Sequence, residues 1–374
     1  MSPKISRIDV LIIGLGPAGA AAAAAARAGG LSVIAIDRRR EVGVPVQCAE
    51  FIPLPLSAYA QREGVIRQPI VGMKSYLPSG EVAVNVFPGL MIDRAAFDQA
   101  LAEQARLKGA ELWLDSRMTT LDAEQQYVTV LRGVETQSGA SVGKPDVETN
   151  ELWRIHYSVL IAADGPHSTV AHALGLPELD VVHTRQYTVP LLRAYEDTDI
   201  WLSNDFPGGY GWLFPKGEYA NLGLGLDKRY TADLKRPLDA LHEHLQDQGL
   251  VGGEIISRTG GAIPVGGLRE HLHVGSMMFT GDAAGLTHPI TGAGIPSAVI
   301  SGERAGQAAV SYLKQGKEEA FADYEEDIRD QFEVSLERAV ARRKWMAQQW
   351  NTTAAQEDAM HRKGWIAFQD YFVA

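Results

Sequence analysis

The stretch IDVLIIGLGPAG at residues 8–19 decides the fold of this chain. It opens with an apolar, β-branched run of strand length and continues into the glycine turn Gly14–Gly19. An alanine-rich helix is expected from there through Ala28, and a second apolar strand, Leu31 to Ile36, ends in Asp37. Because a strand, a glycine turn, a helix, a strand and an acid follow in this order, the segment predicts a dinucleotide-binding βαβ unit.

The glycines and the acid of this unit each have a physical role. Gly14 permits the tight turn, Gly16 lets the backbone approach a pyrophosphate, and Gly19 allows the helix to pack closely on the strand. The N–H groups and the positive dipole end of the helix then face the phosphates. Asp37 can accept hydrogen bonds from both ribose hydroxyls, which argues against NADP at this site. A glycine turn that binds nothing would leave Asp37 unexplained, but the segment alone does not choose between NAD and FAD.

Two later segments repeat the pattern of a strand that ends in an aspartate. Residues 159–167 (VLIAADGPH) form an apolar strand that ends in Asp164 and Gly165, and Ser168 opens a short helix. Residues 277–295 (MMFTGDAAGLTHPITGAGI) form another strand, which continues through a proline loop into a glycine-rich helix start. These segments add a second and a third motif to the first βαβ unit.

The third motif carries the groups that select a flavin. Asp282 is placed to hydrogen-bond the hydroxyls of a ribityl chain, which only a flavin has. The turn at residues 291–295 would point backbone N–H groups at N1 and the C2 oxygen of the flavin, where a helix N-terminus stabilises the anionic reduced ring. Pro289 would stiffen the loop against the ring. The predicted cofactor is therefore FAD.

In their order and spacing, GLGPAG with Asp37, AADGPHS and GDAAG with TGAGI resemble the FAD-dependent hydroxylase and reductase superfamily, which includes p-hydroxybenzoate hydroxylase. DRAAFD at residues 93–98 resembles the superfamily's DR-x-x-F-D helix start, whose arginine, Arg94 here, reaches towards FAD. The resemblance implies an α/β fold with an FAD-binding Rossmann-like domain of the glutathione reductase type, an inserted antiparallel β-sheet substrate domain and a helical C-terminus. The residues expected to bind FAD are Gly14, Gly16, Ala18, Gly19, Asp37, Arg38, Cys48, Ala49, Arg94, Met118, Asp164, Gly165, Asp282, Pro289, Gly292, Gly294 and Ile295.

Two further segments resemble the geranylgeranyl reductase family. VPVQCAE at residues 44–50 is similar to the family's P-x-x-C-A-E signature, in which the cysteine and the alanine, Cys48 and Ala49 here, lie beside the flavin. PGGYGWLFP at residues 207–215 fits the family's P-x-x-Y-x-W-x-F-P pattern at every fixed position. The resemblance implies reduction of carbon–carbon double bonds in an isoprenoid, geranylgeranyl-type substrate. A hydride would pass from reduced flavin N5 to one carbon and a proton to its neighbour.

Tyr210, Trp212 and Phe214 alternate, so on a strand they share one face. Aromatic rings, each burying ~150–250 Å², suit an uncharged tail that shape and apolar area must hold. The other interpretation is a strand that packs its aromatic face into a core, but the flanking prolines and the full motif match favour the substrate. We therefore expect these three residues and Cys48 at the catalytic site. The proton donor stays open between Tyr210, Cys48, a water and His288, which could instead only fix its loop.

The predicted domains are discontinuous in sequence. The FAD-binding domain is expected to comprise residues 1–72, 93–170 and 271–330, the substrate-binding domain residues 73–92 and 171–270, and the C-terminal helical segment residues 331–374. Residues 135–149 are polar and glycine-containing, which predicts an exposed hairpin loop. The C-terminal segment carries Trp345, Trp350 and Trp365, which we expect on helices that cap the domain; the alternative is that they line a lipid tunnel or touch a membrane surface.

Composition limits the function classes. With 374 residues, 45% apolar and 22% charged, the chain is globular, and its formal charge of −11 argues against nucleic-acid or anionic-membrane binding. One cysteine cannot form an internal disulfide or ligate an iron–sulfur cluster, so a cytoplasmic protein without a metal site is expected. The uncharged run Val10–Ala26 is broken by the glycine turn and is shorter than the ~20 residues of a membrane span, so no transmembrane helix is expected.

Two other functions are weighed against prenyl reduction. The main alternative is an FAD-dependent monooxygenase, a hydroxylase on the same scaffold; the W-x-W-x-I-P segment of the related halogenases is absent from the sequence. The other is a flavin carrier without catalysis of its own. No second Rossmann unit is visible, so the electron donor, NAD(P)H, ferredoxin or another protein, stays open. The substrate head group and a transient contact with a membrane surface also stay open.

Overall fold

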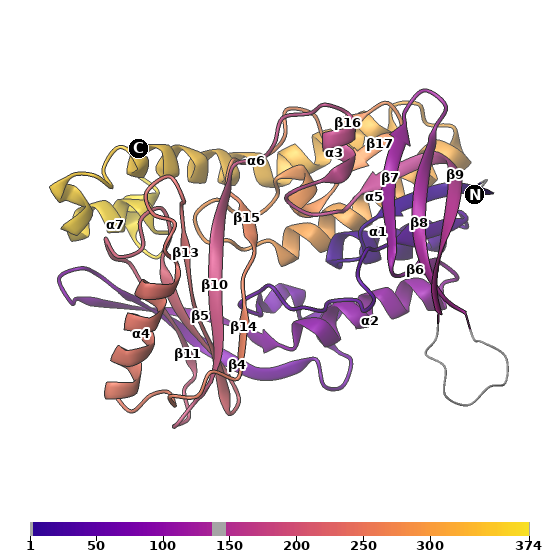
Figure 1. The fold of residues 1–374 in the computed structure, drawn as a ribbon. Coiled ribbons are helices and arrows are strands. Elements are labelled where there is room, and N and C mark those ends of the chain that lie inside the picture. The colour runs from indigo at the N-terminus through magenta and orange to yellow at the C-terminus, as the bar shows by residue number, and fades with distance from the viewer. Residues whose placement is uncertain (1–2, 137–146, 374) are drawn as a thin grey trace, which may run out of the picture.

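The computed structural model describes residues 3–136 and 147–373. Within these ranges the strands form two sheets, of eight and nine strands, which Figure 1 shows side by side. The helices are α1 (Pro17–Ala28), α2 (Arg94–Leu107), α3 (Thr169–Ala173), α4 (Lys235–Asp247), α5 (Ile295–Gln315), α6 (Ala320–Ala347) and α7 (Asp358–Gly364). Short 3-10 helices occupy Leu54–Ala60, Gly281–Ala284, Thr353–Gln356 and Gln369–Tyr371.

The first sheet is built around a parallel core. Its strands are β1 (Lys4–Ile13), β2 (Val33–Ile36), β6 (Glu111–Trp113), β7 (Ser116–Asp122), β8 (Tyr127–Thr136), β9 (Val147–Ala162), β16 (His273–Val274) and β17 (Met277–Phe279). The order β17-β9-β1-β2-β6 is parallel throughout. Because carboxyl ends of parallel strands meet at one edge, the residues after β1, β2, β9 and β17 are brought together there. The predicted strand–turn–helix–strand unit is confirmed, with β1 reaching back to Lys4.

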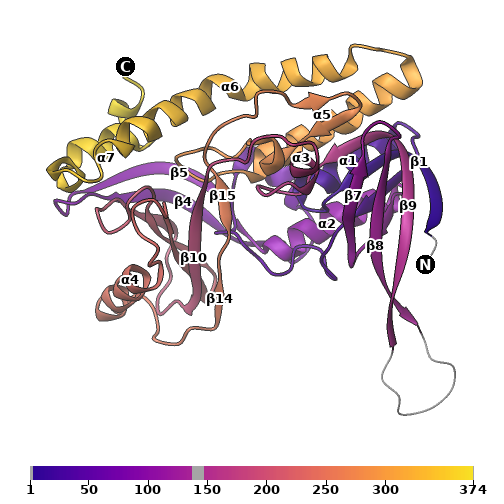
Figure 2. The ribbon, with the colours of Figure 1, turned by 45° about the horizontal axis from the view of Figure 1, so that its top comes forward.

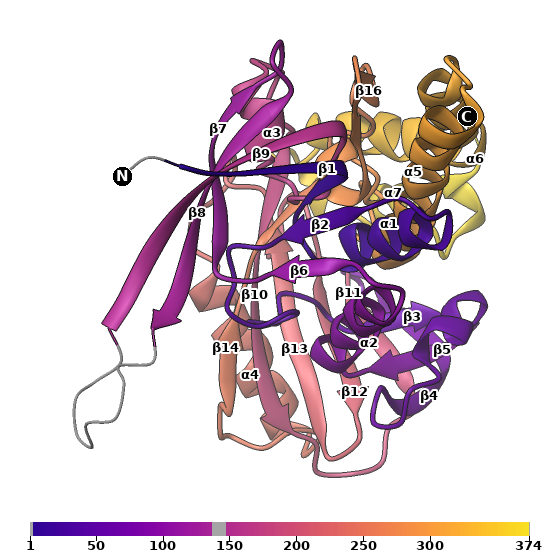
Figure 3. The same ribbon diagram turned by 90° about the vertical axis from the view of Figure 1, so that its right-hand side faces the viewer.

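Small residues set the distance between α1 and α5. A Cβ on Gly302 would overlap the carbonyl oxygen of Ala18, and one on Gly306 would come within 2.5 Å of the carbonyl oxygen of Ala22. The two helices therefore touch backbone to backbone. Figure 3 shows both on one side of the parallel strands, with β7 and β8 on the other side. The small side chains of α1 thus let α5 approach it this closely.

The second sheet is mostly antiparallel, as predicted. Its strands are β3 (Phe51–Pro53), β4 (Ile66–Tyr76), β5 (Val82–Ile92), β10 (Val181–Pro190), β11 (Asp197–Trp201), β12 (Gly211–Lys216), β13 (Tyr219–Leu226), β14 (Ser257–Thr259) and β15 (Ala262–Pro264). Helix α4 packs on β10 and β13 through its leucines. Strands β3 and β4 begin before residue 73, where we placed the start of the substrate domain, because the pairing of β4 with β5 continues to Ile66. We propose that the domain boundary be moved accordingly.

Helix α6 spans both sheets. Figure 2 shows it running from α5, over the first sheet, to α7, above β4 and β5. The turn between β4 and β5 is tied to α7, because Asp358 accepts hydrogen bonds from the backbone and hydroxyl of Ser79, and Arg362 pairs with Glu81. The helical C-terminus is therefore confirmed, and it packs against the second sheet as well as the first.

The predicted loop at residues 135–149 is partly wrong. Strand β8 continues to Thr136 and β9 begins at Val147, and these two residues are paired in the antiparallel register. The polar composition that suggested a loop is tolerated because both strands are at the surface end of a long ribbon (Figure 1). Residues 137–146 lie outside the described residues. None of the described helices is long and apolar enough to cross a membrane.

Candidate active site

The glycine turn after β1 combines two tight contacts with one open space. Gly14 has φ +99°, and a Cβ there would overlap the carbonyl oxygen of Ala163, while a Cβ on Gly19 would overlap the carbonyl oxygen of Gly14. A Cβ on Gly16 would meet nothing within 4 Å. Gly16 is also the N-cap of α1 and makes no side-chain cap, so the first N–H groups of the helix are left for a ligand.

Asp37 holds this turn against the end of β2. Its Oδ2 accepts a hydrogen bond from the backbone N–H of Leu15 at 2.8 Å, and its Oδ1 accepts one from the N–H of Arg39 at 2.8 Å. The neighbouring side chain of Arg38 is exposed. Both carboxylate oxygens thus already have one donor, and each can accept another. The predicted bonds from Asp37 to ribose hydroxyls remain a prediction.

The loop after β17 is shaped by Asp282 and Gly294. Thr287 Oγ1 donates to Asp282 Oδ1 at 2.5 Å, and burial raises the pKa of Asp282. A Cβ on Gly294 would lie 2.5 Å from Thr287 Oγ1, so glycine is needed there. Gly294 is the N-cap of α5 and makes no side-chain cap, which gives this edge a second helix N-terminus with free N–H groups. Of the other residues predicted in the loop, Pro289 and Ile295 are buried and Gly292 has φ +69°.

His288 fixes this loop. Its Nδ1 accepts a hydrogen bond from the backbone N–H of Thr291 at 3.2 Å, and burial lowers the pKa of His288 to about 4. The ring is therefore neutral near pH 7, with Nδ1 as an acceptor. Of the two roles considered for His288, the structure supports the loop-fixing one.

Other predicted cofactor residues have structural partners. Asp164 Oδ2 accepts from the backbone N–H and the hydroxyl of Thr169 at 2.6 and 2.7 Å, so it caps α3 together with Ser168, while Asp164 Oδ1 is buried and has no hydrogen-bond partner among the described residues. Met118 is buried in the core on β7, and Ala18 packs against Gly281. Cofactor contacts of these residues and of Gly165, which has φ +86°, remain predictions.

The residues at this edge fit an FAD molecule. Open space lies in front of Gly16, two helices present uncapped N-termini, and Asp164 keeps one buried oxygen free of any described partner. Uncapped N–H groups suit phosphate and flavin oxygens, and carboxylates suit sugar hydroxyls. The four segments that supply these groups come from the carboxyl ends of neighbouring strands, as ligand sites of this fold do.

The Cys-Ala-Glu loop, residues 45–50, is anchored by side chains of the second sheet. Glu50 has φ +72° and is buried; its carboxylate accepts from Lys216 Nζ at 2.7 Å, from Asn221 Nδ2 at 2.7 Å and from the backbone N–H of Arg94 at 2.8 Å. The carbonyl of Ala49 accepts a further bond from Asn221. Sequence reasoning assigned no role to Glu50, although the C-A-E pattern contains it.

Cys48 lies in this loop and is half-buried. Its Sγ accepts a hydrogen bond from the N–H of Glu50 at 3.2 Å, and its carbonyl accepts one from Gln186 Nε2 at 3.0 Å. Burial raises the pKa of the Cys48 thiol, and the nearby Arg94 guanidinium opposes that shift without cancelling it. The thiol is therefore protonated near pH 7. Arg94 is itself paired with the buried Asp98, at 2.7 Å from Nε to Oδ1.

Tyr210, Trp212 and Phe214, the aromatic row, lie in one apolar cluster, as their alternation predicts. Tyr210 precedes β12, and its hydroxyl donates to the carbonyl of Thr291 at 2.5 Å, which joins the row to the loop before α5. Trp212 is 6% exposed, and its Nε1 donates to Gln186 Oε1 at 3.1 Å. The Phe214 ring meets the ring of Phe51 edge to face at 6.2 Å.

The aromatic row has two further neighbours, Gly223, to which sequence reasoning assigned no role, and Trp365, which it expected on a capping helix with a lipid tunnel as the alternative. A Cβ on Gly223 of β13 would overlap the Trp212 ring, so this glycine provides the room for the indole, and the alternation GLGL at residues 223–226 was the available signal. Trp365 follows α7 and packs 5.0 Å from Tyr210, with its Nε1 donating to Ser75 Oγ at 3.1 Å. Its position depends on the return of the C-terminal segment, which no local pattern reveals.

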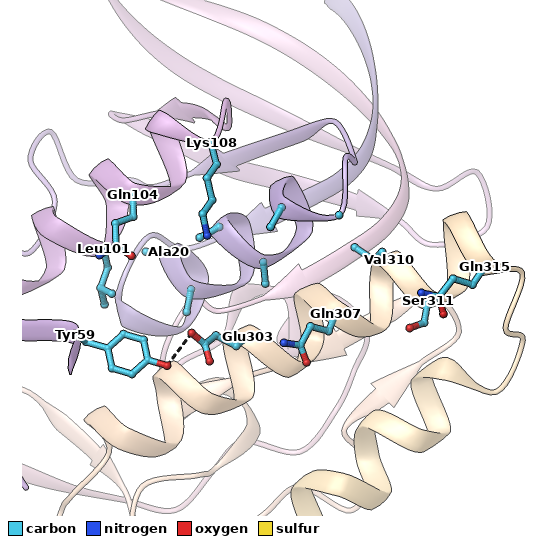
Figure 4. Close-up of a pocket in the computed structure, with 15 residues that line it drawn as sticks. Ala20, Tyr59, Leu101, Gln104, Lys108, Glu303, Gln307, Val310, Ser311 and Gln315 are labelled. Carbon is cyan, nitrogen blue, oxygen red and sulfur yellow. Dashed lines mark hydrogen bonds between the residues drawn. The ribbon is translucent and has the colours of Figure 1, made fainter. Parts of the chain in front are cut away.

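Another cavity lies away from these residues. It has a volume of about 460 Å³ and is floored by alanines of α1, with Gln104 of α2 and Lys108, which follows α2, on one side and Gln307 of α5 on the other (Figure 4). Tyr59 closes one end through a 2.8 Å hydrogen bond to Glu303. None of the predicted site residues lines this cavity. We therefore do not take this cavity as the active site.

Comparison with known proteins places the chain among lipid reductases. Residues 180–263 match the family model "Geranylgeranyl reductase catalytic domain", and residues 231–372 match "Lycopene cyclase protein". The digeranylgeranylglycerophospholipid reductase of Methanosarcina acetivorans is 34% identical over 328 residues, which are 82% of this chain and 76% of that protein. Digeranylgeranylglycerophospholipid reductase 1 of Methanopyrus kandleri is 32% identical over 354 residues, 88% of this chain and 89% of that protein.

Solved structures agree with this placement. The crystal structure of a geranylgeranyl bacteriochlorophyll reductase-like protein from Thermoplasma acidophilum superposes with a TM-score of 0.82 at 27% identity, covering 96% of this chain and 92% of that one. A flavin-dependent halogenase superposes with a TM-score of 0.69 at 19% identity, covering 98% and 69%, which shows the fold alone. These findings confirm the predicted α/β flavoprotein fold and do not favour the monooxygenase alternative. The chain therefore belongs to the geranylgeranyl reductase family of FAD-dependent oxidoreductases.

Proposed function

We propose that this protein reduces the carbon–carbon double bonds of geranylgeranyl chains carried by a glycerophospholipid. The hydrogen bond from Tyr210 to the carbonyl of Thr291 carries the proposal, because it holds the aromatic row against the loop predicted to face the flavin. Relatives named digeranylgeranylglycerophospholipid reductase support the choice of lipid. An apolar chain between the row and that loop would be held by shape and contact area alone.

The residues of the site position and desolvate the alkene. Bound FAD in its reduced form supplies the hydride for one alkene carbon. An isolated alkene has no electron sink, so the chain's own contribution is to exclude water and to fix the reacting carbons. Trp212 and Phe214 provide apolar area for this. The hydrogen bond from Trp212 to Gln186 and the edge-to-face contact of Phe214 with Phe51 keep both rings in place.

Cys48 is the proposed proton donor. Burial raises the pKa of its thiol, so it carries a proton near pH 7. The Tyr210 hydroxyl is committed to the carbonyl of Thr291, and burial raises the pKa of Tyr210 further. His288 is neutral and uses Nδ1 as an acceptor. The Tyr210 proton is thus held by a carbonyl, whereas the Cys48 thiol proton and the Nε2 proton of His288 have no acceptor among the described residues. We choose Cys48 of these two because His288 has a role in fixing its loop.

The electron donor is proposed to be external. Among residues 3–136 and 147–373, the glycine turn at β1 and α1 is the one followed by a helix and a parallel strand ending in an acid. The proposal therefore includes no separate domain for a nicotinamide cofactor. NAD(P)H that docks transiently or a redox protein such as ferredoxin would reduce the flavin.

A transient contact with the membrane surface is part of the proposal, because the substrate is a membrane lipid. Strand β5 exposes Val82, Val84 and Val86 at 41%, 68% and 88%. Phe87, 37% exposed, stacks on Phe51 at 5.6 Å, and Phe51 in turn meets Phe214. Apolar side chains thus lead from an exposed strand to the aromatic row, which suits extraction of a lipid chain.

The experiment uses purified, dithionite-reduced holoenzyme under argon, mixed with geranylgeranyl-bearing phospholipid in detergent micelles. Flavin re-oxidation and product mass are followed together. Re-oxidation with a gain of two hydrogens per reduced bond supports the proposal. Re-oxidation that waits for air and yields an oxygenated product would contradict it.

A further inference from the structure

A group of charged and polar residues lies beside the aromatic row, where the end of α6 and α7 contribute to it. It lines a narrow cleft, here called the polar cleft. Its lining includes the aromatic side chains of Tyr210 and Trp365 and the charged or polar side chains of Asp227, Arg229, Arg343 and His361. Because Tyr210 belongs to the aromatic row, the cleft adjoins that row. No motif in the sequence assigned a function to these charged residues.

Two buried nitrogen atoms of the polar cleft lack partners. Arg343 has a side chain 14% exposed, and its Nε is buried without a hydrogen-bond partner among the described residues. His361 is 1% exposed; its Nε2 bonds to the carbonyl of Ala355, while its Nδ1 is buried and also unpartnered within the described residues. Buried polar groups are normally satisfied, so the N–H at Arg343 Nε points to an acceptor that occupies the cleft. His361 Nε2 donates to a carbonyl and burial lowers the pKa of His361, so its Nδ1 is an acceptor and does not itself bind an anion.

The charge of the polar cleft favours an anion. Asp227 is buried and is already neutralised by Arg229, whose Nε and second terminal nitrogen lie 3.0 and 2.6 Å from its carboxylate. Arg343 adds a second guanidinium, 3.4 Å from the same carboxylate. Two arginines face one aspartate, which leaves one positive charge. A guanidinium with free N–H groups binds phosphate well, because its planar fork matches two oxygens.

The size of the polar cleft fits one oxygen of a phosphate. Its volume is only about 30 Å³, so a small group alone can enter it. Arg229 lines the cleft and its side chain is 64% exposed, so the mouth opens to solvent there. A phosphate would place one oxygen inside, towards Arg343, and keep the others at the mouth.

We propose that the polar cleft binds the phosphate group of the substrate, with Arg343 as its principal ligand and the isoprenoid chain leading from it to the aromatic row. The inference rests on the proposed function for the identity of the chain. It adds the recognition of an anionic head group, which an apolar wall cannot provide. A phospholipid phosphate and a free prenyl diphosphate share this chemistry, and the experiment separates them.

The test measures binding to oxidised holoenzyme by calorimetry, so that no turnover is needed. The ligands are geranylgeranyl diphosphate, digeranylgeranylglyceryl phosphate and uncharged geranylgeraniol, each in detergent micelles, and inorganic diphosphate alone. Arg343→Met should raise Kd about 10- to 100-fold for the phosphate-bearing ligands, the range expected for a lost charge-assisted hydrogen bond, while Kd for the alcohol changes less than about twofold. Arg343→Lys should fall between.

Lys344→Met is the matched control, since it removes one positive charge at the next, exposed position of α6. It should leave all four Kd values unchanged. Asp227 keeps Arg229 as a partner in Arg343→Met, so the variant should fold, and flavin content and melting temperature check this.

The outcomes separate the two ideas. A loss limited to diphosphates supports a free prenyl diphosphate as ligand, and a loss for the phospholipid as well supports the lipid. If Kd changes equally for the alcohol and the phosphate-bearing ligands, or does not change for any of them, the proposed anion site is wrong. If inorganic diphosphate binds to wild-type enzyme and not to Arg343→Met, but no geranylgeranyl compound is reduced, the anion site is supported and the proposed function is rejected.

Discussion

The carboxyl edge of the first sheet and the inner face of the second sheet are built in different ways. At the edge, conformation is dictated by glycines such as Gly14 and Gly19, where no side chain fits. At the inner face, position is dictated by polar side chains, such as the half-buried Lys216 and the buried Gln186, that tie the Cys-Ala-Glu loop to the sheet. The first kind of constraint is local and visible in sequence, whereas the second depends on which strands become neighbours.

The largest effect is expected from Gly14→Ala. The residue has φ +99° and no room for a Cβ, so the substitution should destabilise the fold by about 3 kcal/mol or more and abolish flavin binding. Gly16→Ala is the control, because its Cβ meets open space; it should keep the melting temperature of the flavin-free protein and lower only the affinity for FAD. Equal loss of stability in both variants would show that the two glycines do not differ in role.

At the second sheet, Lys216→Met should destabilise the protein by about 3 kcal/mol, because it leaves Glu50 buried without its cation. Urea unfolding measures this. Lys235→Met removes a lysine from an exposed pair with Asp239 and should change stability little. If both variants behaved alike, the Cys-Ala-Glu loop would not depend on its buried ion pair.

The two regions should respond to pH with opposite signs. Burial lowers the pKa of His288 to about 4, so its share of the unfolding free energy, about 3 kcal/mol, is present above pH ~6.5 and is lost as pH falls towards 4. Burial raises the pKa of Asp199, on β11, to about 6, so its share is present below pH ~4 and is lost as pH rises through 6. Unfolding of His288→Asn and Asp199→Asn between pH 4 and 7 measures each slope; parallel changes in the two variants would contradict the assignment.

The smallest effect is expected from Trp212→Phe, which keeps an aromatic ring and removes the N–H that holds Gln186. Loss of one hydrogen bond should lower kcat about fivefold while the FAD content stays full. The freed Gln186 should also let Cys48 be alkylated faster. Trp153→Phe loses an indole bond to Glu151 on the first sheet and should leave kcat unchanged. An unaltered alkylation rate in Trp212→Phe would separate the aromatic row from the Cys48 loop.

The sequence predicted what short-range geometry determines. The unit from β1 to β2, the cap of α3 by Ser168 and the shared face of Tyr210 and Trp212 all follow from spacing within a few residues. The partners of Glu50 could not be predicted, because Lys216 and Asn221 lie on strands more than 160 positions away.

The same reason hid the polar cleft. Arg343 and His361 acquire their neighbours only when α6 returns over the second sheet. Asp164 is an exception, because its bonds to Thr169 span only five positions and were still not predicted. Chemistry that depends on register between distant strands leaves no periodic trace in a single sequence.

The contact of α1 with α5 has a consequence for how the protein is made. Ala18 and Gly302 touch although roughly 280 positions separate them, and contacts between such distant positions form slowly during folding. A ribosome adding about 5–20 residues per second needs many seconds to reach α5 after α1 has emerged. Through that interval the alanine face of α1 has no partner. We therefore expect the nascent chain to expose an apolar surface that chaperones can bind until α5 emerges.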